Sequence, residues 1–342
     1  MATPAEVKLD SAELKKRVER FQAVRDGILA QVHRVIVGQE EVLDQILTAL
    51  FVGGHCLITG LPGTAKTLMV RTIAQTLGLE FRRIQFTPDL MPSDITGTDI
   101  IEEDATTGRR RWTFVPGPIF GNILLADEIN RTPPKTQSAL LEAMQELSCT
   151  VRGNHYKLPA PFFVLATQNP IELEGTYPLP EAQLDRFLFN TVLDYLSAED
   201  EVKVVDLTTA NRVPEVNAVT NAEEILDFQK LVRMVPIADS LAQYVVHLVR
   251  ATRYKSDHAP DFIKKYVNYG ASVRAAQFIV LAAKARALSR KRYHVAYDDI
   301  TSLAIPVLRH RILLNFHAES DRIDSDEILR RLLEHMPPPK GA

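Results

Sequence analysis

The residues with the clearest chemical potential form a loop with a phosphate-binding pattern. The loop follows G-x-x-x-x-G-K-[ST] except at Ala65, which replaces the second glycine, and it consists of Gly60, Leu61, Pro62, Gly63, Thr64, Ala65, Lys66 and Thr67. An apolar run (55–59) precedes it and a helical stretch (66–77) follows, so its backbone N–H groups can hold a phosphate at a helix N-terminus. We expect Leu68 to border the same site, Lys66 to supply positive charge and Thr67 to bind Mg²⁺. The alternative is a glycine turn with a surface lysine.

A pair of carboxylates follows a later apolar run. Asp127 and Glu128 come directly after 123–126, about 60 residues beyond the loop. A magnesium nucleotide site needs one carboxylate in the metal's coordination shell and a second that polarises the attacking water. We therefore assign Asp127 to the metal and Glu128 to the role of general base. Taken alone, the pair also fits a polar strand end, and its spacing from the loop favours the nucleotide site.

The surrounding pattern predicts a parallel sheet covered by helices. Apolar runs without clean alternation are typical of strands buried on both faces, and they occur at 55–59, 81–86, 123–126, 162–167 and 187–193. Helical spacing precedes them at 12–32 and 42–50, separates them at 135–146, and dominates after 193, at 239–253, 272–289 and 297–313. Ser197 with Asp200, and Thr220 with Glu223, resemble capping boxes.

Two interruptions of this pattern have the character of functional insertions. Residues 86–120 contain several prolines and glycines and are longer than an ordinary connection. Residues 149–158 predict a β-hairpin that turns at Gly153 and Asn154. Met91 and Trp112 in the first insertion could contact a substrate chain, although apolar loop residues more often pack inward.

Composition limits the class of protein. The 342 residues carry a formal net charge of −3, which argues against strong non-specific binding of nucleic acid, and we interpret Arg109, Arg110 and Arg111 as a solvated loop. No apolar segment resembles a signal peptide or reaches the roughly 20 residues that span a bilayer. With two cysteines and no secretory signal, we expect a cytoplasmic protein with reduced thiols.

Together these motifs resemble AAA+ ATPases, and among them the MoxR group, over nearly the whole chain. The resemblance rests on the loop and on the segments 85–94, 125–131, 166–170 and 181–187. It implies an α/β AAA+ P-loop NTPase core, with a parallel five-stranded sheet flanked by helices, plus a small all-helical lid domain. The implied core is 1–196, with a helix 2 insert at about 88–118 and a pre-sensor 1 hairpin at about 148–159. A helical connector (197–232), the lid (233–336) and a disordered tail (337–342) follow.

The resemblance also implies roles for further residues. Asn169 is similar to sensor 1, Arg186 to the arginine finger of a neighbouring subunit, and Arg274 to sensor 2 of the lid. Val37 and Gly38 resemble the segment beside the adenine. The competing interpretations are a turn-forming asparagine, a salt bridge between Arg186 and Asp185, and an exposed helical arginine at 274. The sequence leaves open whether Arg274 acts in its own subunit or in a neighbour.

The implied activity is hydrolysis of ATP with Mg²⁺ by a homo-oligomeric ring, most simply a hexamer. The work would be remodelling, assembly or activation of partner proteins, for which the MoxR resemblance implies proteins with von Willebrand factor A domains. Two alternatives stay open. One is a DNA or chelatase-type motor of the same clade, and the other is a nucleotide-gated binding switch with little turnover.

Overall fold

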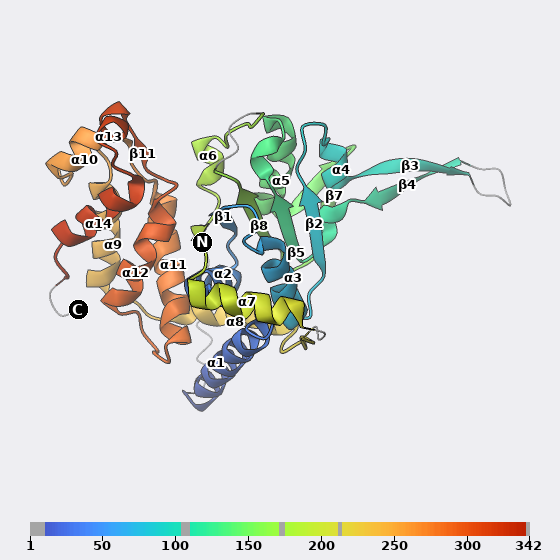
Figure 1. Cartoon of the computed structure of the whole chain (residues 1–342), viewed down its shortest axis with the longest axis horizontal. Helices are drawn as coiled ribbons and strands as arrows, with labels where there is room; N and C mark the ends of the chain where they lie inside the picture. Colours follow the sequence, from blue (N-terminus) through green and yellow to red (C-terminus); the bar gives the residue numbers. More distant parts are fainter. Residues whose placement is uncertain (1–10, 104–109, 171–174, 211–213, 340–342) are drawn as a thin grey trace, which may run out of the picture.

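The computed structural model describes residues 11–103, 110–170, 175–210 and 214–339. Its centre is a sheet flanked by helices, with a mainly helical C-terminal region on one side and a long two-stranded hairpin extending from the other (Figure 1). Arg109 of the basic run and residues 340–342 of the predicted tail lie outside the described residues. Arg110 and Arg111 are exposed to solvent, as predicted, but they belong to a strand, so the predicted loop is wrong for these two residues.

The central sheet has five parallel strands in the order β2-β5-β8-β1-β9, which confirms the predicted α/β class. The strands are β1 (Cys56–Gly60), β2 (Phe81–Gln85), β5 (Ile123–Asp127), β8 (Phe163–Gln168) and β9 (Phe189–Leu193). In register, Ala126 of β5 lies beside Ala166 of β8, and Thr59 of β1 lies beside Gln168. The loops after β1, β5 and β8 therefore leave the sheet at the same edge.

Successive residues of each strand bury opposite faces, which explains the continuous apolar runs. Leu125 and Leu165 belong to a core shared with α1 (Ser11–Val32), α2 (Glu40–Val52) and α3 (Lys66–Thr76). Leu124 and Val164 belong to a second core with α5 (Pro134–Glu146) on the other face. Both cores form because helices cover both faces of the sheet.

The C-terminal helical region comprises α9–α14 with a short two-stranded ribbon. Its helices are α9 (Asp239–Ala251), α10 (Asp261–Tyr266), α11 (Val273–Ser289), α12 (Tyr297–Leu308), α13 (Phe316–Ser320) and α14 (Ser325–His335), and the ribbon pairs β10 (Val267–Tyr269) with β11 (Leu313–Leu314). The predicted helix at 297–313 is too long, because the chain turns after Leu308 to form β11. Among the described helices, none combines the length and apolar character that crossing a bilayer requires.

Two helices connect the sheet to this region: α7 (Ala198–Thr209) and α8 (Ala222–Met234). The Ser197 side chain caps α7 as predicted, accepting from the Asp200 N–H. The cap of α8 is Asn221, one residue later than predicted, because its side chain reaches the Glu224 N–H while Thr220 bonds the Glu224 carboxylate. Since α8 continues to Met234, it runs across the proposed boundary at 232, and the domain limits stay a prediction.

The two insertions form hairpins that pack together. The first contains α4 (Pro92–Thr96), β3 (Gly97–Glu103), β4 (Arg110–Pro116) and a short 3-10 helix, η1 (Pro118–Phe120), and the second pairs β6 (Ser148–Val151) with β7 (Asn154–Lys157). Phe114 stacks on Tyr156 with ring centroids 4.0 Å apart, and the Arg152 guanidinium lies 4.3 Å from the Trp112 ring centre. The turn of the second hairpin is Arg152–Gly153, one residue earlier than predicted, because both residues have positive φ and Asn154 pairs with Val151.

Candidate functional site

The glycine-containing loop joins β1 to α3, as its sequence predicts. Gly63 and Ala65 both have left-handed backbones, with φ of 81° and 59°. The Lys66 ammonium donates to the carbonyls of Gly60 and Leu61, at 3.0 and 2.6 Å. A Cβ on Gly60 would come within 2.8 Å of Leu193 on β9, so this glycine permits the close packing of two strands.

A cavity of about 490 Å³, which we call the loop cavity, brings together the central predicted residues. Its walls come from the loop, from the start of α3 and from the ends of β5 and β8, and its lining residues are Pro62, Gly63, Thr64, Ala65, Lys66, Thr67, Leu68, Asp127, Glu128, Thr167 and Asn169. Burial lowers the pKa of Lys66, while the charges of Asp127 and Glu128 act in the opposite direction. One cation, two carboxylates, three hydroxyls and an amide therefore line one space.

The position of Asp127 is fixed from two neighbouring strands. The Thr167 hydroxyl donates to one Asp127 oxygen at 2.6 Å and accepts from the Glu128 N–H at 2.8 Å. The Arg83 guanidinium on β2 donates to the other Asp127 oxygen at 2.7 Å. Sequence reasoning missed both partners. Their signal is weak, because each is a polar residue in a strand that becomes adjacent to Asp127 only through the sheet order.

Glu128 also has a left-handed backbone, with φ of 56°, which is uncommon for a residue other than glycine. Its carboxylate accepts from the Gln85 amide at 2.8 Å and from the Arg131 guanidinium at 3.1 Å. Unfavourable backbone conformations of this kind concentrate at functional sites when the surroundings hold them in place. The Thr167 bond and these two side chains are such surroundings.

An apolar cavity of about 400 Å³ adjoins the loop cavity and shares Gly63, Thr64, Ala65 and Leu68 with it. Predicted Val37 lines it, next to Val35 and Ile36. Its far wall was missed from the sequence and comes from the segment after β9 and from α7: Asp194, Tyr195, Leu196, Glu201, Val204, Val205, Leu207 and Thr208. A polar cavity that continues into an apolar one suits a ligand with phosphates at one end and a flat base at the other.

The other predicted residues lie outside these two cavities. Gly38 lines neither cavity, and Gly60 and Leu61 contribute carbonyls to Lys66 rather than to the cavity wall. Arg186 donates to the Leu141 carbonyl on α5, and Arg274 forms an ion pair with Asp185 at 3.4 Å. Arg274, the predicted sensor 2, is therefore paired with the residue that directly precedes Arg186, the predicted arginine finger, and neither arginine lines the chain's own loop cavity.

Comparisons with known proteins agree with this arrangement. Residues 55–189 match the ATPase family associated with various cellular activities (AAA), and residues 262–332 match the AAA lid domain. Chaperone MoxR1 of Mycobacterium tuberculosis is 41% identical over 319 residues, covering 90% of this chain and 83% of the relative. The uncharacterized protein YeaC of Bacillus subtilis is 44% identical over 303 residues, covering 88% and 91%.

A solved structure extends the agreement to the whole fold. The crystal structure of a candidate ATPase from Cytophaga hutchinsonii is 41% identical, with a TM-score of 0.88, and the match covers 96% of this chain and 100% of that one. The family matches contain the loop, the acidic pair and most of the C-terminal helical region. The chain belongs to the MoxR group of AAA+ ATPases.

Proposed function

We propose that this protein hydrolyses ATP to ADP and phosphate with Mg²⁺, as a homo-oligomeric ring that remodels or activates partner proteins. The observation that carries the proposal is the continuity of the two cavities across Gly63, Thr64, Ala65 and Leu68. This continuity allows one nucleotide to place its base among the apolar side chains and its terminal phosphates beside Lys66, Asp127 and Glu128.

The residues of the loop cavity have complementary parts in this reaction. Backbone N–H groups of the loop and the Lys66 ammonium bind the phosphates. Thr67 and Asp127 supply the oxygen ligands that Mg²⁺ prefers, and the bound ion would neutralise phosphate charge. Glu128 accepts a proton as water attacks the γ-phosphorus, and the bond to the β-phosphate oxygen breaks. The Asn169 amide, which lines the same cavity, would orient that water.

We further propose that Arg186 and Arg274 act on ATP bound by the neighbouring subunit. Neither arginine lines the chain's own loop cavity, and the ion pair of Arg274 with Asp185 keeps it beside the residue that precedes Arg186. An arginine that reaches a γ-phosphate from a neighbour neutralises charge that develops in the transition state. Activity would then require assembly, for which the family resemblance suggests a hexamer.

The general-base role is tested with Glu128→Gln, which removes the proton acceptor and keeps the side chain's size. We expect turnover to fall by about 100-fold or more while ATP binding is retained. Glu146→Gln, an exposed substitution on α5, is the matched control and should behave like wild type. Equal hydrolysis by Glu128→Gln and wild type would reject the assignment, and negligible turnover by wild type would favour a nucleotide-gated switch.

The client class is tested by adding candidate partners to the ATPase assay. A relative named as a chaperone supports protein remodelling, and the family resemblance suggests a partner with a von Willebrand factor A domain. We expect such a protein to change the turnover rate and to be captured by ATP-bound Glu128→Gln. Stimulation by duplex DNA, with no response to the protein, would instead favour a DNA motor.

A further inference from the structure

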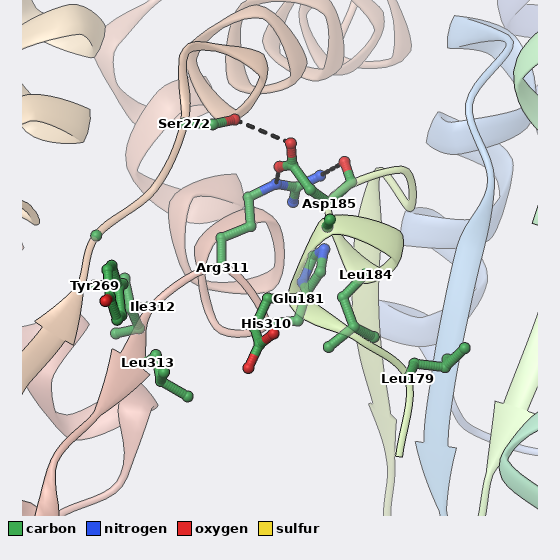
Figure 2. A pocket seen from close by; sticks show the side chains of 12 residues that line it. Leu179, Glu181, Leu184, Asp185, Tyr269, Ser272, His310, Arg311, Ile312 and Leu313 are labelled. Carbon is green, nitrogen blue, oxygen red and sulfur yellow. Dashed lines mark hydrogen bonds and ion pairs between the residues drawn. The ribbon is translucent and has the colours of Figure 1, made fainter. Parts of the chain in front are cut away.

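One carboxylate joins the segment that carries Arg186 to the C-terminal helical region. Asp185 follows α6 (Glu181–Leu184), and one of its oxygens accepts from the Arg311 guanidinium at 2.8 Å. The other oxygen accepts from the Ser272 hydroxyl at 3.0 Å and from Arg274 at 3.4 Å. Figure 2 shows Arg311 and Ser272 meeting Asp185 from two separate segments, at the side of a cavity of about 650 Å³.

Arg311 fastens the backbone on both sides of Arg186. Its side chain is 1% exposed, and it donates to the carbonyls of Asp185 at 2.9 Å and Leu188 at 3.3 Å, and also to that of Phe187. Burial lowers the pKa of Arg311 to about 10, and the charge of Asp185 opposes that shift. A buried guanidinium needs acceptors for its donors, so this one holds the 185–188 segment firmly against the helical region.

The same carboxylate also acts at the start of α11. Ser272 caps this helix by accepting from the Arg274 N–H at 3.2 Å, and its hydroxyl donates to Asp185. The Arg274 side chain is 40% exposed, so its guanidinium retains access to solvent while Asp185 limits its direction. Asp185 therefore contacts the immediate surroundings of both arginines that the proposed reaction uses.

We propose that Asp185 is a positioning residue that sets Arg186 and Arg274 as a pair for the ATP of the neighbouring subunit. It would also make the presentation of both arginines depend on the position of the C-terminal helical region, since Arg311 and Ser272 belong to that region. This inference rests on the proposed function, in which the two arginines act across a subunit interface.

The first test is the kinetics of Asp185→Asn. Asp185 does not line the chain's own loop cavity, so we expect the KM for ATP to stay within about twofold, while kcat falls by about 10- to 100-fold because both arginines are misplaced. The matched control is Asp326→Asn, which removes the carboxylate partner of a different arginine, Arg309, within the helical region. It should retain the wild-type kcat. A raised KM with unchanged kcat for Asp185→Asn would overturn the inference.

The second test mixes subunits, which separates positioning from general misfolding. Glu128→Gln subunits keep their arginines but cannot hydrolyse ATP, whereas Asp185→Asn and Arg186→Ala subunits keep their own cavities. Mixing either of the latter with Glu128→Gln should restore turnover above that of the unmixed variants. If only Arg186→Ala is complemented, the inference for Asp185 is wrong and the trans function stands. If neither is complemented, the trans function fails together with the inference.

A folding control keeps the test decisive. Circular dichroism and thermal unfolding show whether Asp185→Asn folds, because the change leaves Arg311 without its carboxylate. If it does not fold, Asp185→Glu replaces it in both assays, since this variant keeps a negative charge beside Arg311 and moves the carboxylate by one methylene. A folded Asp185→Glu protein with wild-type kcat would contradict the proposed positioning.

Discussion

Ala65 holds a left-handed backbone at the loop position where the phosphate-binding pattern has glycine. A left-handed conformation costs a residue with a Cβ about 1–2 kcal/mol, whereas glycine adopts it freely. Replacing Ala65 with glycine would remove this cost. Glycine also raises the conformational entropy of the unfolded chain, which offsets about 0.4–1 kcal/mol of the stability gained. We therefore predict that Ala65→Gly changes the free energy of unfolding by between zero and about +1.6 kcal/mol and retains ATP binding.

Denaturant unfolding of Ala65→Gly beside Ala65→Val checks this prediction. Valine is branched at Cβ and should destabilise the loop, because a left-handed conformation is least tolerated by such residues. A loss of more than about 1 kcal/mol in the glycine variant would show that the methyl group contributes packing that outweighs the backbone strain.

Some residues around the loop cavity could be predicted from sequence motifs, and others could not. Lys66, Asp127 and Glu128 could be placed in one site from their sequence positions, because a phosphate loop and the ends of parallel strands meet at one sheet edge, whereas Asn169 was expected there only from the family resemblance. Thr167 and Arg83 could not, since their contacts with Asp127 depend on which strands are neighbours. Arg274 was expected near the nucleotide from resemblance, and its pairing with Asp185 depends on how the helical region packs.

At the scale of elements, His55 connects the start of β1 to α5 and β8. Its Nδ1 accepts from the Val164 N–H at 3.1 Å, and its Nε2 lies 3.2 Å from the Met144 carbonyl, so the neutral ring fits both contacts. Burial lowers its pKa from 6.5 to about 4. Between pH 6.5 and 4 the unfolded chain therefore binds more protons than the folded one, and folding stability falls as the pH falls.

We predict that the His55 imidazole alone lowers the free energy of unfolding by roughly 3 kcal/mol between neutral pH and pH 4. Unfolding free energies across that window should show a shallower pH dependence for His55→Gln than for wild type. His294→Gln, which replaces an exposed histidine, is the control and should keep the wild-type slope. Identical slopes for wild type and His55→Gln would mean that His55 is not kept neutral by the fold.

The helix α7 provides a second prediction at this scale, because it closes one side of the apolar cavity. Val205 lines that cavity and is 58% exposed. Val202 on the same helix is similarly exposed, at 61%, and does not line the cavity. A carboxylate at 205 would sit beside the nucleotide base and repel the phosphates. We expect Val205→Asp to weaken ATP binding by about 10-fold and Val202→Asp to leave it unchanged, as measured with a fluorescent nucleotide.

The elements themselves were predicted with uneven success. The five sheet strands and α3 were recognisable, because unbroken apolar runs and a phosphate loop are local signals. The pairing of β3 with β4 was missed, since Pro and Gly frame the insertion and its exposed strands carry mixed side chains such as Ile101 and Trp112. The turn at Arg152–Gly153 was placed one residue late, because sequence alone does not fix which residue adopts positive φ.

At the scale of the whole molecule, the helical region and the sheet share one core. Phe21 of α1, Phe51 of α2 and Phe228 of α8 have ring centroids 4.7 to 6.0 Å apart. Asp44 of α2 pairs with Arg25 at 2.6 Å and with Arg286 of α11 at 3.4 Å. No local pattern predicts these contacts, because their partners are separated by as many as 242 positions along the chain.

This shared core limits which arginines can reach the loop cavity of the same chain. Since α11 is packed against α1 and α2, and Arg274 in its first turn is paired with Asp185, Arg274 does not line the chain's own loop cavity. Bringing it to that cavity within one chain would require breaking the ion pair with Asp185. Receiving an arginine from another copy requires no such change, so assembly is the simpler way to complete the site.

We therefore predict that turnover per chain rises with protein concentration and reaches a plateau, while ATP affinity measured per chain stays constant. Arg186→Ala should bind ATP normally and remain nearly inactive across the same dilution series, because neighbouring copies of this variant supply no arginine at position 186. Steady-state hydrolysis measured beside sedimentation analysis distinguishes the cases. Constant turnover per chain at dilutions where sedimentation shows only monomers would mean that a single copy completes the site, and the arginines would then need another role.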